Sequence, residues 1–344
     1  MSTIPSVKLS VVIPTMGRPI LIQTLESLAA TKSFDDIEII VAGEIPDLQV
    51  MEQLRAIQSA HPRIVHLPIS FPVGDSSRKK NEGFRRAQAD VVAFLDDDVF
   101  VCRDWPDLIL KPFEDESVGA ASGPSLVPDD VKLFARLAGT ALQSKAAGYV
   151  AERYLKSGAH IRPISWSRII GCNMAYRRPV LESIGMFPPE FWPGEEMIAA
   201  WRTQQAGHKI VFYDDAWVYH YPRSSLWRFL KQMHGYGATR IRLLRAGVEF
   251  EPTTVVPGVW VLSLAVLGLA AVFSRWVSYL LGLDIAAYLL AALYITLNKY
   301  AETRKAEHLF IFFLVPLMHL SYGIAEWVEL LRPGKDLSER TLSK

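Results

Sequence analysis

Cysteine is scarce in this sequence, and neither sign of charge is in excess. Two cysteines among 344 residues exclude a disulfide scaffold and fit a reducing compartment. The 37 Lys and Arg residues almost cancel the 36 Asp and Glu residues, so no positive field indicates nucleic acid as a partner. A hydrophobic share of 50% excludes a disordered chain, and a charged share of 21% excludes a wholly membrane-embedded one. The first residues lack a long apolar core, so we expect no signal peptide.

Short apolar runs alternate with helical patterns up to about residue 250. We expect strands at Leu9–Pro14, Ile37–Val41, Ile64–Leu67 and Val91–Leu95, and helices at 19–31, at 47–60 and around 81–88. This alternation predicts an α/β fold with a mostly parallel sheet, whose ligands bind at the carboxyl ends of the strands. Pro14 and Thr15 lie at one such end, and Asp96, Asp97 and Asp98 follow another.

Three long apolar runs follow residue 252, namely Val255–Phe273, Trp276–Leu297 and Leu309–Val328. Each is long enough for a helix to cross about 30 Å of hydrocarbon. A soluble domain of buried helices is the less favoured alternative, because an amphipathic soluble helix needs no uninterrupted apolar run. We therefore expect the C-terminal quarter of the chain to lie in a membrane.

The number of spans and their orientation are harder to predict. Without an export signal, residues 1–250 should lie on the cytoplasmic face of the plasma (inner) membrane. Three spans then place the basic loop 298–308 inside, as the positive-inside rule prefers, but they place the basic C-terminal residues from Arg332 onward outside. We expect two or three spans, and the third run, which contains Pro316 and Glu326, is the candidate for a re-entrant segment.

Three consecutive carboxylates directly after an apolar strand require a physical explanation. Like charges so close repel one another, and a divalent cation that accepts hard oxygen ligands removes the repulsion. Mg²⁺ or Mn²⁺ in such a site typically brings phosphate oxygens with it. The alternative is a solvated acidic turn without an ion.

Six motifs occur in an order that is more specific than any one of them. They are Val11–Thr15, Lys80–Gly83, Asp96–Asp98, Gly171–Arg178, Gly194–Glu196 and Val218–His220. In this order they resemble the opening strand, Arg-Asn-x-Gly, D-x-D, acceptor-side strand, Gly-Glu-Asp and strand-end histidine of family 2 glycosyltransferases, which have the GT-A fold. The resemblance covers about residues 8–245. Arg228–Gly237, the apolar runs and His319–Gly323 are similar to the membrane-bound branch that builds exopolysaccharide repeat units, the succinoglycan type.

The resemblance implies a domain plan. Residues 1–225 would form the GT-A domain, 226–250 an amphipathic juxtamembrane segment, and 251–344 a membrane domain.

The resemblance also implies roles for donor and metal binding. The nucleotide-diphosphate sugar would contact Pro14, Thr15, Glu44, Lys80, Asn81 and Asp96. The divalent cation, Mn²⁺ or Mg²⁺, would be held by Asp96, Asp98 and His220. A structural histidine is the alternative for His220. Glu44 stands where members commonly carry an aspartate that reads the nucleobase, so the identity of the base stays open.

Glu195 and Glu196 are the candidates for the general base that deprotonates the acceptor. Both would open a helix, whose dipole stabilises a carboxylate, and capping is the alternative role. Glu196 matches the aspartate of the family motif and is favoured. With a single base and no second nucleophilic carboxylate, the simpler mechanism is direct displacement with inversion.

Acceptor binding is assigned to Asn173 and to a basic amphipathic stretch that contains Arg240 and Arg242. This stretch would hold the phosphates of a lipid-linked acceptor, or it would only be attracted to anionic lipid in the bilayer. Gln232–Tyr236 departs from the Gln-x-x-Arg-Trp of processive synthases. The sequence thus predicts a membrane-anchored inverting transferase that adds one sugar to a polyprenyl-linked saccharide, in exopolysaccharide or cell-envelope glycan assembly. The alternatives are a polyprenyl-phosphate glycosyltransferase and an inactive membrane scaffold.

Overall fold

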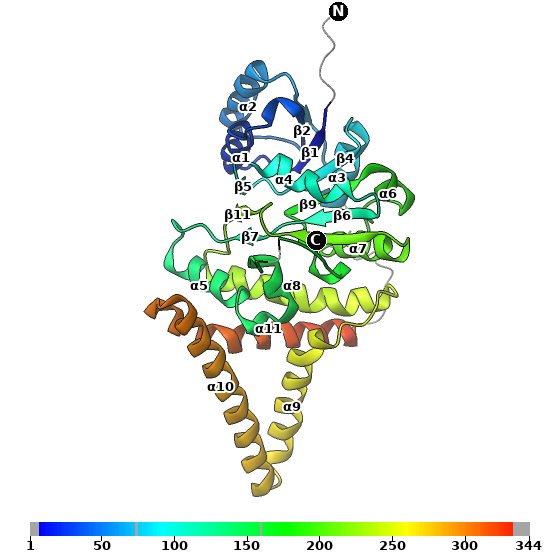
Figure 1. Cartoon of the computed structure of the whole chain (residues 1–344). Coiled ribbons are helices and arrows are strands. Elements are labelled where there is room, and N and C mark those ends of the chain that lie inside the picture. Colours follow the sequence, from blue (N-terminus) through cyan, green and yellow to red (C-terminus); the bar gives the residue numbers. More distant parts are fainter. Residues whose placement is uncertain (1–6, 73–74, 159, 333–344) are drawn as a thin grey trace, which may run out of the picture. The chain divides into compact units, whose positions relative to one another are not determined.

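The computed structural model describes residues 7–72, 75–158 and 160–332. The chain divides into two compact units (Figure 1). The first contains residues up to 128 together with 152–221, and the second contains 129–151 together with the helices that follow residue 222. The segment 129–151 is therefore grouped with the C-terminal helices, although it lies within the sequence range of the predicted GT-A domain.

An eight-stranded sheet forms the centre of the first unit. Its strand order is β3 (Ile64–Leu67), β2 (Ile37–Ala42), β1 (Leu9–Pro14), β4 (Val91–Leu95), β9 (Asn173–Arg177), β6 (Val118–Ser122), β10 (Lys209–Tyr213) and β8 (Ile161–Pro163). The first four strands are mutually parallel, while β9 is antiparallel to both of its neighbours. The structure confirms the four strands expected from the sequence. β1, β2 and β4 are buried along almost their whole length, as short apolar runs in a parallel sheet are, whereas β3 at the edge is mostly half-buried.

Helices connect these strands. They are α1 (Ile20–Ala29), α2 (Leu48–Ala60), α3 (Asp75–Arg86), α4 (Trp105–Leu110), α6 (Arg178–Ser183) and α7 (Glu195–Gln205), with 3₁₀ turns at Phe34–Asp36, Lys111–Glu114 and Trp166–Arg168. The side chain of Asp47 accepts hydrogen bonds from the first turn of α2 and so begins that helix. The apolar residues Val50 and Leu54 of the same helix are buried.

A small second sheet brings distant motifs together at the end of β4. Its order is β5 (Val99–Val101), β11 (Val218–His220) and β7 (Ser125–Leu126). His220 pairs with Val99, the residue after Asp98, and Asn173 pairs with Leu95, the residue before Asp96. The register of these two strand pairs therefore places the histidine and the start of the acceptor-side strand beside the aspartates.

The second unit is helical. It contains α5 (Leu133–Leu142), α8 (Leu226–Arg245), α9 (Val256–Ala271), α10 (Arg275–Thr303) and α11 (Ile311–Leu331), with 3₁₀ turns at Pro252–Val255 and Ala306–Phe310; another 3₁₀ segment, Lys145–Tyr154, leads back into the first unit. Three segments are long and apolar enough to cross a membrane, namely Pro252–Ala271, Arg275–Thr303 and Ala306–Leu331. Within this unit α9 and α10 form a V-shaped hairpin, and α11 runs beside α8 (Figure 1).

Candidate active site

Asp97, the middle aspartate of the cluster, has a structural role. It accepts a hydrogen bond from the Thr15 hydroxyl over 2.6 Å and another from the Arg18 guanidinium, and its backbone carbonyl accepts from Thr24 over 3.0 Å. These bonds fasten the loop after β1 to the end of β4. Thr15, predicted to contact the donor, is buried and orders this loop.

Asp96, Asp98 and His220 form the one group that could ligate a metal ion among the described residues. Their ligand atoms all lie within 4.8 Å of one another, and His220 Nε2 lies 3.2 Å from Asp98 Oδ1. Two carboxylate oxygens and an imidazole nitrogen suit Mn²⁺, and Mg²⁺ with added water or phosphate oxygens. The donor set therefore fits the divalent cation expected from the sequence.

The two outer aspartates have opposite pKa shifts. Burial raises the pKa of Asp96 above its ordinary value, and the neighbouring carboxylate of Asp98 adds to the shift. Burial acts in the same direction on Asp98, but hydrogen bonds from His220 and Arg18 hold the pKa of Asp98 well below its usual range. Asp98 therefore stays ionised near neutral pH and can ligate a cation as a carboxylate.

Arg18 belongs to this site although the sequence analysis did not identify it. Its guanidinium lies 3.0 Å from Asp98 Oδ2 and also donates to Asp97. The side chain is about half exposed, so it can exchange these carboxylates for the phosphates of a ligand. Its position just after Gly17, in the loop at the carboxyl end of β1, was the available signal.

The adjacent glutamates at the start of α7 have different environments. Glu195 is buried, and its Oε1 lies 2.9 Å from Nζ of the equally buried Lys80. Ser76 and the Gly194 amide also donate to the Glu195 carboxylate. The Glu195 carboxylate is therefore engaged by an ion pair and two hydrogen bonds inside the protein.

Glu196, the favoured candidate for the general base, has no such lysine partner among the contacts above. Burial, followed by the neighbouring Glu195 carboxylate, raises the pKa of Glu196 to about 7. Its side chain lies beside Gly171, just before the start of β9. A base is most effective when its pKa is near the working pH, so the environment selects Glu196 over Glu195, as the family motif also does.

Two predicted ligand residues use their side-chain amides inside the protein. The Asn81 amide donates to the carbonyl of Phe187 and accepts from its N–H, over 2.8 and 3.1 Å. The Asn173 amide accepts from Trp105 over 3.0 Å and donates to Ala216 over 2.8 Å. Both residues are buried, and their roles in donor and acceptor binding stay predictions.

The remaining predicted residues are Pro14, Glu44, Arg240 and Arg242, and each has its own surroundings. Pro14 ends β1, and Glu44 is exposed just after β2. In the second unit, the buried Arg240 guanidinium packs 4.9 Å from the centre of the Tyr149 ring, and the half-buried Arg242 donates to the Ala238 carbonyl.

The sheet topology and the carboxylates at the end of β4 define the GT-A class of transferases, which use nucleotide-sugar donors. The chain belongs to the glycosyltransferase-like family 2, whose sequence profile matches residues 5–235. A mannosyltransferase from Pyrobaculum calidifontis, solved with GDP-Man and Mn²⁺, has a similar fold, with a TM-score of 0.57 at 19% identity over 94% of this chain and 87% of that one.

Two curated relatives carry names that specify a sugar. The O-antigen chain rhamnosyltransferase WbaN of Salmonella anatum is 27% identical over 229 residues, which are 60% of this chain and 70% of that protein. The O-antigen chain rhamnosyltransferase RfbN of Salmonella typhimurium is 25% identical over 182 residues, 47% of this chain and 56% of its own length.

Proposed function

We propose that this protein is a membrane-anchored, metal-dependent, inverting glycosyltransferase that moves one sugar from a nucleotide-diphosphate sugar to a polyprenyl-linked saccharide. The observation that carries the proposal is the pairing, in one unit, of an Asp-Asp-His ligand group with a glutamate whose pKa is raised to about 7. The first suits a diphosphate leaving group, and the second suits a hydroxyl acceptor.

The chemistry requires one bond to form as another breaks. A divalent cation bound by Asp96, Asp98 and His220 would neutralise the charge that develops on the leaving diphosphate. Glu196 removes the proton of the acceptor hydroxyl as its oxygen attacks the anomeric carbon and the bond to the diphosphate oxygen breaks. Arg18 holds Asp98 in its anionic form and offers a second positive charge to the phosphates.

The relatives suggest which sugar is transferred, which kind of acceptor receives it and where in the cell the transfer takes place. Because two of them are O-antigen rhamnosyltransferases, we propose a deoxyhexose such as rhamnose as the transferred sugar. O-antigen relatives and the apolar helices support a lipid-linked acceptor and a place at the cytoplasmic face of the inner membrane.

The test is a transfer assay with detergent-purified protein and a panel of UDP-, GDP- and TDP-sugars, including TDP-rhamnose, in the presence of a lipid extract. We expect nucleotide release from one donor with Mn²⁺ or Mg²⁺, and its loss with EDTA. Asp98→Ala should lower the rate at least 100-fold and weaken Mn²⁺ binding measured by electron paramagnetic resonance. Glu82→Gln, which removes an exposed carboxylate of α3, is the matched control and should change neither. Silence with every donor, together with no nucleotide binding by calorimetry, would refute the proposal in favour of a scaffold.

A further inference from the structure

The three apolar helices differ in how much of each is covered by protein. In the most apolar window of α9 and of α10, 17% and 11% of the residues are buried, against 39% for the segment that contains α11. Within the described chain, the buried residue of α9 is Gly258, near its start, and those of α10 are Ala292, Thr296 and Lys299, near its end. The rest of the hairpin exposes apolar side chains on all sides, as a lipid-facing hairpin does.

Helix α11 packs lengthwise against α8. The Ser321 hydroxyl donates to the Leu230 carbonyl over 2.8 Å, and a Cβ on Gly237 would lie 2.2 Å from the Tyr322 carbonyl oxygen. Eight residues further along both helices, Arg245 donates to the carbonyl of Leu330 over 2.9 Å. From the Gly237–Tyr322 contact to the Arg245–Leu330 contact, the position rises by eight residues in both helices, so the two helices run parallel.

The close contacts of α11 with α9 include several near the start of that helix. The Trp327 indole donates to the Gly258 carbonyl over 2.7 Å, and a Cβ on Gly323 would lie 2.4 Å from the Pro257 carbonyl oxygen. From Gly258 the hairpin continues for about 20 Å to its turn at 272–274, at 1.5 Å per residue. With a hydrocarbon thickness of about 30 Å, α11 would lie in the outer 10 Å or so, the depth of an interfacial helix.

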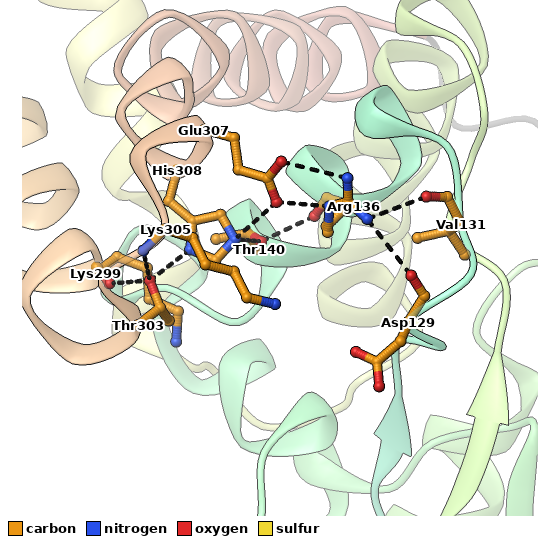
Figure 2. Close-up of polar contacts among 9 residues, drawn as sticks. All are labelled: Asp129, Val131, Arg136, Thr140, Lys299, Thr303, Lys305, Glu307 and His308. Carbon is orange, nitrogen blue, oxygen red and sulfur yellow. Dashed lines mark hydrogen bonds and ion pairs between the residues drawn. The ribbon is translucent and has the colours of Figure 1, made fainter.

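The junction between α10 and α11 is strongly polar (Figure 2). Arg136 of α5 pairs with Glu307 over 2.6 Å, and the buried His308 ring contacts the hydroxyls of Thr140 and Thr303 over 3.3 and 2.7 Å. Charged groups this dense belong at the aqueous boundary of a bilayer. The start of α11 therefore lies at that boundary, and the middle of α11 contacts the start of α9, which enters from the same side.

The exposed side of α11 is an apolar stripe with helical spacing. It consists of Phe313, Leu317, Ile324, Val328 and Leu331. The opposite side carries the buried Glu326 and Glu329, and Glu329 lies within 3.8 Å of Arg245 and 3.5 Å of Arg332. The same buried side also contains apolar residues such as Val315 and Met318, so α11 packs on protein along one side and exposes its apolar stripe on the other. A helix with one lipid-facing stripe and a protein-packed side that bears two carboxyl groups suits the membrane interface better than a third span.

We propose that α11 lies in the plane of the membrane, with its apolar stripe in the lipid, and that α9 and α10 are the only two spans of the described chain. This inference rests on the membrane anchoring in the proposed function. Two spans return the chain to the side of the first unit, so Arg304, Lys305 and Arg332 all lie inside. The conflict that three spans create with the positive-inside rule disappears.

Cysteine labelling in intact and permeabilised spheroplasts tests the number of spans, using a membrane-impermeant maleimide on the full chain. Both native cysteines are buried, so the unsubstituted chain is the blank. Ser274→Cys at the hairpin turn should label in intact spheroplasts. Ser343→Cys should label only after permeabilisation, like Ser59→Cys on exposed α2 of the first unit.

Labelling of Ser343→Cys in intact spheroplasts would overturn the inference and leave the anchored transferase in place. Release of the protein from membranes by alkaline carbonate would instead refute the anchoring itself, and the inference with it.

A depth measurement distinguishes an in-plane helix from a tilted span. Fluorophores on Phe313→Cys and Val328→Cys are 15 residues apart, so a span would place them roughly 20 Å apart in depth. We expect both to be quenched equally, and best by lipids with shallow nitroxides, whereas Leu269→Cys in α9 should be quenched by deep ones. A graded depth from Phe313 to Val328 would overturn the proposal.

Discussion

At the scale of single residues, one lysine separates the roles of two adjacent glutamates. Lys80 pairs with Glu195 inside the protein, and this leaves Glu196 beside a fixed negative charge in a poorly solvated position. Burial, and after it the Glu195 carboxylate, raise the pKa of Glu196 against an opposing effect of Lys80, so Glu196 can accept a proton near neutral pH.

The role of Glu196 predicts a pH profile. Below about pH 7 the carboxyl is protonated, so kcat/KM for the wild-type protein should fall about tenfold per pH unit and level off above pH 7. Glu196→Gln should lower kcat by about 10²–10⁴-fold and abolish this slope, and Glu196→Asp should retain part of the activity. Steady-state transfer rates between pH 5.5 and 8.5 measure this. If the acceptor is instead a polyprenyl phosphate, which needs little deprotonation, Glu196→Gln keeps substantial activity.

The same carboxyl has a predictable effect on stability. Its pKa is about 7 in the folded protein and near 4.5 when unfolded, so the folded state binds the proton more tightly. The stability it contributes is full below pH 4.5 and is lost as pH rises to about 7. The free energy of unfolding of Glu196→Gln should therefore exceed that of the wild type at pH 8 by on the order of 1–3 kcal/mol, with little difference at pH 4.5. The variant should accordingly have the higher melting temperature at pH 8. A thermal shift of equal size at both pH values would contradict this account.

The Lys80–Glu195 pair predicts a different response to mutation. Lys80→Met leaves a buried carboxylate without its cation and should cost about 3–5 kcal/mol, while the double variant Lys80→Met/Glu195→Leu should recover much of that loss. Chemical denaturation of the four corners of this cycle measures the coupling. Glu82 and Arg85 form an exposed pair on the same helix and supply the control cycle, whose coupling should stay below about 1 kcal/mol.

Sequence reasoning named the three residues that the structure brings together as a possible metal group, but it did not foresee the hydrogen bonds of every polar side chain. Asp96, Asp98 and His220 are recognisable because each follows an apolar strand at a defined place in the motif order. Asn81 and Asn173 have the same appearance in the motifs, yet their amides bind backbone groups from segments far away in sequence. Such pairings depend on tertiary structure, and no local pattern reveals them.

At the scale of secondary structure, periodicity predicted most elements but not their placement in the membrane. Helix α3 begins at Asp75, six residues before its expected start at Asn81. The first four strands and α1 and α2 lie within a residue or two of the expected bounds, because apolar spacing decides them. Helix α11 has the same length and composition as a spanning helix. Only its contacts with α8 and with the start of α9 distinguish it, and these again depend on tertiary structure.

The close approach of α8 and α11 predicts opposite effects for two glycines in one helix. A methyl group on Gly237 would lie 2.2 Å from a backbone oxygen of Tyr322, whereas one on Gly235 would meet nothing within 4 Å. Gly237→Ala should destabilise the helical unit by about 1–3 kcal/mol through overpacking. Gly235→Ala should stabilise it by about 0.5–1 kcal/mol, because alanine favours the helix. Thermal unfolding in detergent measures both, and equal shifts of the same sign would show that the helices are not in contact.

At the scale of the whole molecule, the chain leaves and re-enters its first unit. Residues 129–151 lie between two parts of the catalytic unit, yet they contact the C-terminal helices. Phe134 packs on Phe229, Arg136 pairs with Glu307, and the Ala146 carbonyl lies 2.8 Å from Nε2 of His319. A boundary at residue 225 therefore separates α5 from its partners.

This arrangement makes a prediction for soluble fragments. A fragment that contains residues 1–225 keeps α5 but removes the helices that cover it, so apolar residues such as Ala138, Ala141 and Leu142 lose their cover. We expect this fragment to self-associate in sedimentation velocity experiments. A companion fragment of equal length, with residues 132–148 replaced by Gly and Ser, should sediment as a monomer and still bind Mn²⁺, because Asp96, Asp98 and His220 all belong to the first unit. Two monomeric fragments would show that α5 needs no cover, and two aggregating ones would show that the first unit requires the helices for its own stability.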